Sequence, residues 1–453
     1  MNPLQNCDAP AGLFTDLYEL TMAAGYFQNG FDARATFELF VRRLPRERNY
    51  LVAAGIEQAL EFLESLSFSV DAIDFLRKQP VFRHVRQEFF DYLAKLRFTG
   101  EVWTVPEGTV LFPEEPLLRI TAPIIEGQLV ETRVLSSINF QTMIASRAAR
   151  IVTAAAGRDV VEFGARRAHG SEAGILAARA AWIAGCAGTS NMVAAKKFGI
   201  PAYGTQAHSW IMAFESESQA FARFMDIFPE HATLLLDTYD TRAALEKIIA
   251  SGRKPAGVRL DSGDMAADSR WVRRELDRAG WRDVQIFASG DLNEQKIATL
   301  LRRGAKIDAF GVGSALVAPT DTTNLSTIYK LVEVERGGKT REAAKFSEAK
   351  ATYPGRKQVF RFSDARGKWK HDEIALANES SAGAPLLVPF MRDGKRISPA
   401  EPLENARSRC AESLKKLPPR LLTLGPAQPY PLRHSKALRA LMQQVRKRVR
   451  AQH

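Results

Sequence analysis

The sequence predicts an α/β protein, in which an irregular parallel α/β barrel is joined by a companion α+β domain formed by the N- and C-terminal flanks. Three observations lead to this prediction. In the middle of the chain short apolar runs alternate with helix-length segments, polar residues gather where those runs end, and both flanks contain strands separated by turns. We expect residues 1–130 and 329–453 to form the companion domain and residues 131–328 to form the barrel with the functional site.

The composition indicates a soluble, cytoplasmic protein. The chain has 453 residues, of which 45% are hydrophobic and 25% charged, as in ordinary globular proteins. Its cysteines, Cys7, Cys186 and Cys410, are odd in number and lack a CxxC spacing, so neither a disulfide framework nor a zinc site is expected. No segment approaches the roughly 18 to 20 apolar residues of a membrane span, and no signal peptide opens the chain. We therefore expect no membrane association.

The first flank predicts helices followed by antiparallel strands. The segments "NYLVAAGIEQALEFLESL" from Asn49 and "PVFRHVRQEFFDYLAKL" from Pro80 have the spacing of amphipathic helices. The stretch "EVWTVPEGTVLFPEEPLLRITAP" from Glu101 follows, and its proline and glycine punctuation is typical of an antiparallel sheet.

The middle of the chain predicts repeated βα units. Strands of a parallel sheet are buried on both faces and therefore form continuous apolar runs. Between the runs, "TRAALEKIIASG" is expected to be a helix capped by Thr241 and closed by Gly252, and "NEQKIATLLRRG" a helix capped by Asn293 and closed by Gly304. The six predicted strands are "DVVEFGAR" from Asp159, "IPAYGT" from Ile200, "TLLLDTYD" from Thr233, "AGVRLDSGD" from Ala256, "VQIFASGD" from Val284 and "DAFGVGS" from Asp308.

Polar clusters at the ends of these runs favour a barrel over a doubly wound sheet. In a barrel the carboxyl ends of all strands meet at one mouth, whereas an open sheet brings together mainly those near its switch point. The clusters occupy residues 163–167, 205–209, 237–240, 259–264, 289–291 and 311–314.

The second flank returns to strands and ends in a basic tail. "IYKLVEVE", "KQVFRFSD" and "APLLVPFMRDGKR" predict strands, and Arg446, Lys447, Arg448 and Arg450 cluster on a predicted helix that we expect to be a solvated face. The net charge of +12 also suits polyanionic ligands such as phosphates. Because no zinc finger, RNP sequence or homeodomain helix is present, nucleic acid is not an expected partner.

A series of eight motifs resembles the nicotinate phosphoribosyltransferase family. In chain order they are "FTDLYELTM", "VETRVLSSINFQTMIASRAARI", "EFGARRAHG", "GTSN", "YGTQAHSW", "RLDSGD", "ASGDLNE" and "FGVGS", and they cover the chain from about Gly12 to Val334. The resemblance implies an ATP-coupled, ligase-type enzyme of NAD biosynthesis, which joins nicotinate to 5-phosphoribosyl 1-diphosphate and releases nicotinate mononucleotide and pyrophosphate. It also implies Mg²⁺ as cofactor, ATP as co-substrate and a homodimer with shared active sites.

The resemblance assigns residues to the pyridine ring. Phe163 and Tyr18 of the partner subunit would be stacking walls, and Arg166 would lie near the carboxylate. The alternatives are that Phe163 is the last core residue of its strand and that Tyr18 packs on its own helix.

Other motifs offer groups for the sugar and the phosphates. Arg259 is a cation and Asp261 a carboxylate just past a strand, where a ribose hydroxyl or a magnesium-bound water could meet it. Phosphoribosyl transfer builds positive charge on the ribose, so positioning and electrostatics dominate its catalysis. "FGVGS" could instead be a tight turn; a dinucleotide fingerprint is disfavoured because Leu316 stands where the third glycine belongs. Small residues whose backbone can approach a phosphate are Ser289, Gly290, Asp291, Gly311 and Gly313, and Thr205 and Ser209 are further expected substrate-binding residues.

His208 is the expected phosphoryl acceptor. An imidazole is substantially neutral at physiological pH, and its free ring nitrogen is a nucleophile. In the family the histidine at this place is phosphorylated from ATP. No GxxxxGK[ST] loop is present, so ATP must use a site of another kind, which we expect at the same mouth. The alternative is a histidine that only makes a structural hydrogen bond.

Three other functions remain open. Nicotinamide-specific relatives carry an aspartate where this chain has Ser190, and a carboxylate there would repel nicotinate, so Ser190 favours the acid. A quinolinate enzyme would call for a denser cationic pocket and would leave the His208 motif without a role. A non-catalytic phosphoribosyl- or nucleic-acid-binding protein could use the basic tail.

Overall fold

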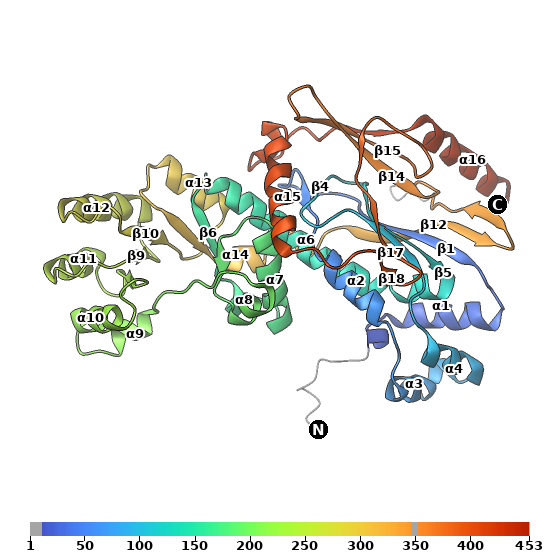
Figure 1. Cartoon of the computed structure of the whole chain (residues 1–453), viewed down its shortest axis with the longest axis horizontal. Helices are drawn as coiled ribbons and strands as arrows, with labels where there is room; N and C mark the ends of the chain where they lie inside the picture. The colour runs from blue at the N-terminus through green and yellow to red at the C-terminus, as the bar shows by residue number, and fades with distance from the viewer. Residues whose placement is uncertain (1–10, 347–351, 453) are drawn as a thin grey trace. The chain divides into compact units, whose positions relative to one another are not determined.

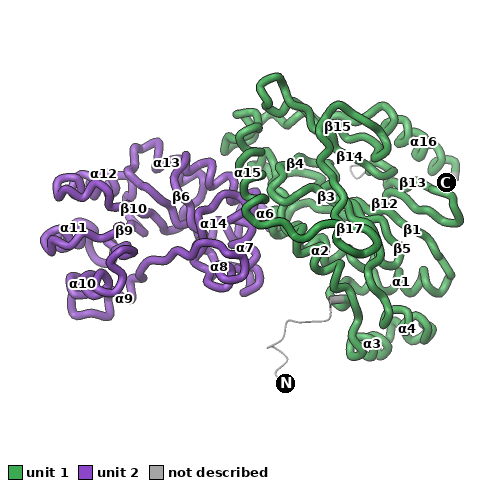
Figure 2. Tube along the Cα trace, in the orientation of Figure 1, with its two compact units in different colours: residues 1–143, 324–453 green, residues 144–323 purple. Residues whose placement is uncertain are grey.

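The computed structural model describes residues 11–346 and 352–452 (Figure 1). The chain divides into two compact units, which are described separately (Figure 2). Unit 1 comprises Met1–Met143 and Asn324–His453, and unit 2 comprises Ile144–Thr323. The two flanks thus share one unit, while the domain boundaries expected at 130/131 and 328/329 stay a prediction.

Unit 1 contains a seven-stranded sheet in which strands from both flanks lie side by side. β1 (Arg34–Val41) pairs antiparallel with β5 (Pro116–Pro123) on one edge and with β12 (Thr327–Arg336) on the other. All residues of β1 except Arg34 are buried. The full order is β13 (Lys339–Glu342), β12, β1, β5, β3 (Glu101–Thr104), β17 (Val388–Arg392) and β18 (Lys395–Arg396).

Buried ion pairs reinforce this unit. Lys357 Nζ lies 2.8 Å from Glu38 Oε2, which joins β14 (Lys357–Ser363) of the second flank to β1 of the first. Arg361 and Asp372 form a second buried pair at 2.6 Å. Removing one partner of such a pair leaves an uncompensated buried charge, so these contacts oppose separation of the strands that carry them.

The smaller sheets and the helices complete unit 1. A four-stranded sheet has the order β16 (Ala384–Pro385), β14 (Lys357–Ser363), β15 (Trp369–Leu376) and β19 (Leu432–His434), and β2 (Leu51–Val52) pairs with β4 (Val110–Leu111). The helices are α1 (Leu17–Gln28), α2 (Ile56–Ser65), α3 (Val70–Arg77), α4 (Gln87–Lys95), α5 (Ile124–Leu129), α15 (Leu403–Lys416) and α16 (Lys436–Gln452), with short 3-10 turns at Ala11–Leu13, Pro80–Phe82 and Pro419–Leu422. Helix α6 (Glu131–Ala154) runs from unit 1 into unit 2.

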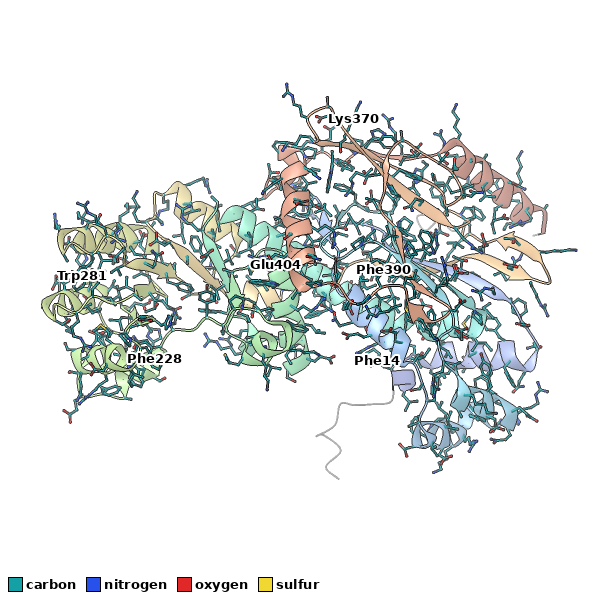
Figure 3. All side chains as sticks on the ribbon, viewed as in Figure 1. Phe14, Phe228, Trp281, Lys370, Phe390 and Glu404 are labelled. Carbon is teal, nitrogen blue, oxygen red and sulfur yellow. The ribbon has the colours of Figure 1, made fainter. Side chains whose placement is uncertain are left out.

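Unit 2 is a six-stranded sheet whose neighbouring strands are all parallel. Large apolar side chains also reach the surface of this unit: Phe228, which follows α10 (Glu217–Ile227), is 45% exposed (Figure 3). The strand order is β7 (Gly188–Thr189), β6 (Asp159–Glu162), β11 (Ala309–Val312), β10 (Gln285–Ala288), β9 (Gly257–Leu260) and β8 (Thr233–Leu235). The helices are α7 (Ser171–Ile183), α8 (Met192–Phe198), α9 (His208–Met212), α10 (Glu217–Ile227), α11 (Thr241–Ala250), α12 (Met265–Arg278), α13 (Glu294–Arg302) and α14 (Ser314–Val317), with a 3-10 turn, η3, at Ala165–Arg167.

The predicted parallel sheet is confirmed, with five of its six strands. The run from Ile200 is not a strand: it makes one parallel bridge, between Thr189 and Ala202. Further along the same segment, Gln206 Nε2 donates to the carbonyl oxygen of Thr233 at 3.5 Å. Segment 200–206 thus contacts both edge strands, β7 and β8, although no described strand pairs with both of them.

Two predicted helix starts were wrong, one in its capping residue and one in its position. Helix α11 is capped by Asp240, not by Thr241, because the Asp240 carboxylate accepts a hydrogen bond from the Ala243 amide at 2.7 Å. The helix predicted from Asn49 begins only at Ile56. There the side chain of Glu107 accepts from the amides of Gly55 and Ile56 at 2.6 and 3.0 Å.

The second helix predicted in this flank also starts later than expected. The segment from Pro80 begins as a 3-10 turn, and α4 starts at Gln87. The cap of α13 at Asn293 is confirmed, since its side chain accepts from the Lys296 amide at 2.8 Å.

Two of the three cysteines can be placed. Cys186 and Cys410 are buried and unbridged in the described chain, and Cys7 lies outside the described residues. Across residues 11–346 and 352–452, none of the helices combines the length and apolar composition that a membrane crossing requires.

Candidate active site

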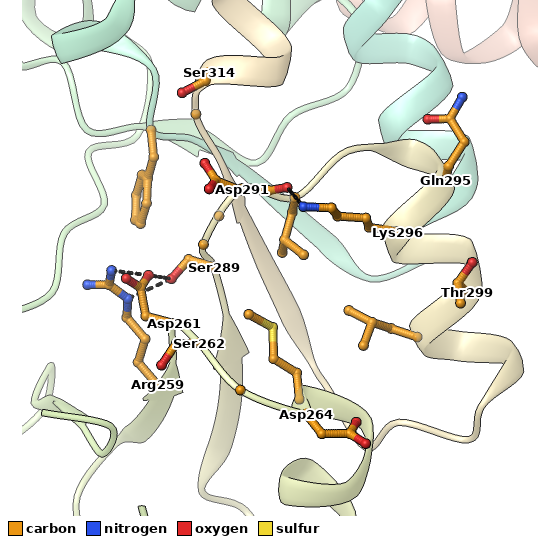
Figure 4. A pocket seen from close by; sticks show the side chains of 18 of the residues that line it. Arg259, Asp261, Ser262, Asp264, Ser289, Asp291, Gln295, Lys296, Thr299 and Ser314 are labelled. Atoms are coloured by element: carbon orange, nitrogen blue, oxygen red, sulfur yellow. Dashed lines mark hydrogen bonds and ion pairs between the residues drawn. The ribbon is translucent and has the colours of Figure 1, made fainter. Parts of the chain in front are cut away.

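A cavity of about 780 Å³ opens at the carboxyl ends of the strands of unit 2 (Figure 4). Parallel strands present their carboxyl ends on one side of the sheet, so the residues that follow them converge there. The lining residues come from the ends of β6, β9, β10 and β11 and from one face of α13. They are Phe163, Arg166, Arg167, Arg259, Asp261, Ser262, Gly263, Asp264, Met265, Ser289, Gly290, Asp291, Leu292, Gln295, Lys296, Thr299, Leu300, Arg303, Gly311, Gly313 and Ser314.

Three side chains form a closed hydrogen-bonded ring on one wall of the cavity (Figure 4). Arg259 donates from Nε to Ser289 Oγ at 2.7 Å and from Nη2 to Asp261 Oδ1 at 2.5 Å. Ser289 Oγ in turn donates to Asp261 Oδ1 at 2.5 Å. The residues meet because β9 and β10 are paired in parallel.

The same contacts set the charge of Asp261. Burial raises the pKa of its carboxyl, but the hydrogen bonds from Ser289 and Arg259 and the positive charge of Arg259 outweigh burial and leave the pKa below its usual value. Asp261 is therefore a carboxylate at neutral pH. Its second oxygen, Oδ2, accepts no hydrogen bond from the described residues, so it is open to a hydroxyl group or to a metal-bound water.

His208 is the first residue of α9 and lies beside this ring. Its Nε2 is 3.8 Å from Asp261 Oδ2, and its Nδ1 is 3.1 Å from Thr238 Oγ1. The side chain is 42% exposed. Thr205, from the same motif, accepts a hydrogen bond from Arg259 Nη1 at 2.7 Å. The histidine and the pocket-lining Arg259–Asp261 pair thus form one connected polar group.

Phe163, which follows β6, supplies an aromatic ring to the lining of the cavity. Its amide donates to the carbonyl oxygen of Val312 at 2.8 Å, and its ring lies 5.5 Å from that of Phe287 at an angle of 34°. A methyl group on Gly311 would come within 2.7 Å of the Phe163 ring, so a glycine is needed at that position for the ring to lie over β11. Phe163 is only half-buried, which leaves part of its ring facing the cavity.

A buried carboxylate lies beneath the loops that carry these residues. Glu162 accepts hydrogen bonds from the Gly164 amide and, at 2.6 Å, from Thr189 Oγ1. Burial raises the pKa of Glu162. The exposed Ser190 is held beside it, because its amide donates to the Glu162 carbonyl at 3.0 Å. The ends of β6 and β7 are thus fastened to each other.

Most of the site residues predicted from the sequence share the cavity. Thr205 and His208 contact the lining residues without lining the cavity, and Ser190, which follows β7, is hydrogen-bonded through its amide to the end of β6. Ser209 is exposed on α9 and makes no side-chain contact with the lining residues in the described chain. The predicted residues that line the cavity are Phe163, Arg166, Arg259, Asp261, Ser289, Gly290, Asp291, Gly311 and Gly313.

Tyr18 belongs to unit 1, on α1. Burial and the negative charges of Glu131 and Glu19 raise the pKa of its hydroxyl, yet the side chain is 45% exposed. Packing within its own chain therefore leaves nearly half of Tyr18 exposed.

Several lining residues were missed by the sequence analysis. Arg167 lay within the polar cluster predicted at residues 163–167 but was given no role; it neighbours Arg166 on η3, and the doubled arginine was the signal that could have identified it. Lys296 donates to the Asp291 carbonyl at 2.8 Å, and Arg303 pairs with Asp264 at 2.6 Å. Both cations reach the cavity from the side of α13. Their only sequence signal was the position of α13 directly after the "ASGD" cluster.

No group of three or more His, Cys, Asp or Glu side chains in the described ranges is arranged as a set of metal ligands. Mg²⁺ that arrives with a diphosphate usually needs only one or two protein carboxylates. Asp261 Oδ2 and the exposed Asp291 fit that lesser requirement.

Comparison with known proteins gives one consistent result. Profiles described as the nicotinate phosphoribosyltransferase (NAPRTase) N-terminal domain, family and C-terminal domain match residues 13–139, 159–375 and 380–442. The chain is 46% identical over 419 residues to the nicotinate phosphoribosyltransferase pncB2 of Mycobacterium tuberculosis, covering 91% of this chain and 89% of that protein. It is 40% identical over 383 residues to the nicotinate phosphoribosyltransferase of Bacillus subtilis, covering 82% and 77%.

A solved structure agrees with these relatives. The crystal structure of human nicotinic acid phosphoribosyltransferase superimposes with a TM-score of 0.84 at 26% identity, covering 95% of this chain and 99% of the human chain. Because three family profiles match in order along the chain and a relative is 46% identical over nine-tenths of its length, this chain belongs to the nicotinate phosphoribosyltransferase family.

Proposed function

We propose that the protein is a nicotinate phosphoribosyltransferase that makes nicotinate mononucleotide and pyrophosphate from nicotinate and 5-phosphoribosyl 1-diphosphate, in the salvage branch of NAD biosynthesis. The observation that supports this most is the cavity itself. It combines an aromatic wall at Phe163, a cation at Arg166 and the hydrogen-bonded ring of Arg259, Asp261 and Ser289.

The chemistry follows from the charges on these walls. The nicotinate ring stacks on Phe163 with its carboxylate toward Arg166, and its ring nitrogen attacks C1 of the ribose. The C1–O bond to the diphosphate breaks, and positive charge develops on the ribose. The Asp261 carboxylate stabilises that charge, while Arg259 favours the negative diphosphate. Mg²⁺ bound to the diphosphate would neutralise part of its charge, with Asp261 or Asp291 as the protein's contribution.

The energy coupling is assigned to His208. Phosphoryl transfer from ATP to a neutral imidazole needs a cation near the transferring group. Arg259 can serve as that cation, because it donates hydrogen bonds to Thr205 and Asp261, and Asp261 lies 3.8 Å from His208. ATP is the co-substrate, and its phosphates occupy the same cavity. We also propose that segment 200–206, which contacts β7 and β8, completes an irregular barrel around this mouth.

Substrate choice rests on two loops. Ser190 places no negative charge at the end of β7, so a pyridine carboxylate is not repelled there. The arginine pair of Arg166 and Arg167 supplies more positive charge than the sequence analysis expected. This second arginine, together with Lys296 and Arg303 on the α13 side of the cavity, would favour quinolinate, a dicarboxylate, as an alternative substrate.

We further propose a homodimer with shared active sites. One face of α1 and the turn before it expose four large apolar side chains: Phe14 (46%), Leu17 (54%), Tyr18 (45%) and Met22 (38%). A second copy of the chain that covers this face would bring Tyr18 of the partner subunit toward a pyridine ring.

The experiment is an assay of products. The protein is incubated with 5-phosphoribosyl 1-diphosphate, Mg²⁺ and either nicotinate, nicotinamide or quinolinate, with and without ATP, and the nucleotides are separated by chromatography. Nicotinate mononucleotide is expected, with a faster rate when ATP is present. Arg166→Met and Arg167→Met form a matched pair, in which the first should raise KM for nicotinate more than the second. Product from quinolinate alone, or no nucleotide at all, would contradict the proposal.

A further inference from the structure

The motif from Val130 to Ile151 has no role in the proposed function, although its last residues lie on the part of α6 that belongs to unit 2. Two arginines of this part, Arg147 and Arg150, have side chains that are each only 3% exposed. Burying a guanidinium is costly unless its charge and its N–H groups find partners. The partners of these side chains therefore indicate what they do.

Arg147 contacts the starts of two helices. Its Nη1 lies 2.7 Å from Oε1 of Glu294, the fully buried first residue of α13. Its Nε donates to the carbonyl oxygen of Ala315, in α14, at 3.2 Å. Nη1 is also 3.5 Å from Oδ1 of Asp321, in the stretch that follows α14. One buried guanidinium thus bridges α13 and α14.

The two helices begin directly after residues that line the cavity. Residues 289–293 connect β10 to α13, and Gly313 connects β11 to α14. Ser289, Gly290, Gly311 and Gly313 all line the cavity. A guanidinium is planar and presents its donors in fixed directions, so it holds its two partners at one separation. The separation of the two helix starts is also that of the loops before them.

Other hydrogen bonds tie each loop to the strand on its outer side. The Ser289 amide donates to the carbonyl oxygen of Leu260, the last residue of β9, at 2.9 Å. The Val312 carbonyl accepts from the amide of Phe163, which follows β6, at 2.8 Å. The pairing between β10 and β11 ends before either loop begins. Arg147 therefore supplies a link from one loop to the other.

We propose that Arg147 is a positioning residue that sets the spacing of the loops at residues 289–293 and 311–313, so that both bind phosphate groups of one 5-phosphoribosyl 1-diphosphate molecule. This role rests on the proposed function. The substrate has a phosphate at one end of the ribose and a diphosphate at the other, so it needs two anion-binding loops at a fixed distance. Small residues let backbone N–H groups approach phosphate oxygens. Arg147 does not line the cavity and acts through the loops.

A matched pair of variants separates the spacing of the loops from the stability of the buried cluster. Arg147→Lys keeps the positive charge, but a single ammonium group does not reproduce the two directions of the guanidinium, so the hydrogen bond to the Ala315 carbonyl is lost. Arg150→Lys is the control. Arg150 is equally buried one turn further on, and its Nε lies 3.3 Å from the same oxygen of Glu294. Both variants disturb that ion pair, and only Arg147→Lys removes the hydrogen bond from Arg147 to α14.

The measurement is calorimetric titration of the full-length protein with 5-phosphoribosyl 1-diphosphate and Mg²⁺, without nicotinate or ATP, beside thermal unfolding. The two variants should lose similar amounts in Tm. The Kd should rise about tenfold in Arg147→Lys, the effect of about one lost hydrogen bond, and should stay within about twofold of wild type in Arg150→Lys. In Arg147→Lys the KM for this substrate should rise as the Kd does, with kcat changed less than about threefold.

Each other outcome has a definite meaning. An unchanged Kd in Arg147→Lys, or equal losses of affinity in the two variants, would overturn the role of Arg147. If Arg147→Lys does not fold, Arg147→Gln and Arg150→Gln form a second matched pair with the same expected difference. Binding by wild type without formation of nicotinate mononucleotide would overturn the proposed function, and the titration would still decide the role of Arg147. A wild-type protein that does not bind 5-phosphoribosyl 1-diphosphate would overturn both.

Discussion

Gly290 lies beside Ser289 and packs closely against the backbone of Asp261, so replacing it should damage the site more than the fold. Its φ is +92°, and a Cβ added there would lie 1.8 Å from the carbonyl oxygen of Asp261. Ordinary contact begins at about 3.4 Å, so Gly290→Ala must move the loops apart by roughly 1.5 Å. Because a misplacement of about 1 Å can cost on the order of 100-fold in rate, kcat/KM should fall at least that far.

Gly280 supplies the matched control. Its φ is +80°, and no atom lies within 4 Å of a Cβ added there. Gly280→Ala therefore carries the same left-handed strain, about 1–2 kcal/mol, without a clash. Both variants are assayed for steady-state production of nicotinate mononucleotide and for thermal unfolding. A Gly290→Ala enzyme whose kcat/KM stays within about threefold of Gly280→Ala would refute the argument that the packing of these two loops sets the site.

Three further predictions concern selectivity, pH and assembly. Ser190→Asp should lower kcat/KM for nicotinate far more than for nicotinamide, because only the acid meets like-charge repulsion; equal losses in the two assays would remove Ser190 from the specificity site. Burial raises the pKa of Glu19 to about 7, above the value of about 4.3 that a glutamate has in an unfolded chain. The stability that the protonated Glu19 gives the folded state is therefore fully present below about pH 4.3 and is lost as the pH rises through 7. Glu19→Gln, which stays neutral, should match wild type at pH 4 and exceed its free energy of unfolding by about 1–3 kcal/mol at pH 8 in urea titrations, and a constant difference across that range would contradict the assignment. Tyr18→Ala and Arg166→Ala chains, each inactive alone, should regain roughly a quarter of wild-type activity when mixed, through the one intact site of each mixed dimer, whereas inactivity of the mixture would indicate a site within one chain.

Repetition along the chain made the central sheet predictable. Five buried strands, each followed by a polar cluster, were visible as apolar runs because both faces of a parallel sheet are covered. The sixth run, from Ile200, has the same composition but makes one bridge only. β7 has two residues, Gly188–Thr189, too few to produce a pattern. Hydrophobicity alone does not show whether a short run finds pairing partners on both sides.

The start of a helix could not be predicted where its cap comes from a residue that is distant in the sequence. Nothing near Gly55 in the sequence marks the start of α2, because the capping carboxylate belongs to Glu107. For α11 the correct cap, Asp240, stood next to Thr241 in the sequence. Its backbone is extended, and an aspartate side chain caps a helix as well as a threonine hydroxyl does.

The site residues likewise fall into those that the sequence could predict and those that it could not. Phe163, Asp261 and Ser289 could be predicted because each directly follows a strand, and strand ends converge. Lys296 reaches the cavity from the side of a helix, so its position depends on how α13 packs against the sheet. The contact of His208 with Thr238 joins two loops 30 residues apart, and the sequence contains no pattern that specifies it.

Labelling with γ-labelled ATP tests the proposed coupling at His208. Wild-type protein should acquire label that is labile in acid and stable in base, as expected for a phosphoramidate, and His208→Ala should acquire none. ATP hydrolysis and its stimulation of synthesis should disappear together in the variant, while a slow ATP-independent formation of nicotinate mononucleotide remains, since that step needs only positioning and charge stabilisation. A His208→Ala enzyme that still hydrolyses ATP in step with product formation would contradict the assignment.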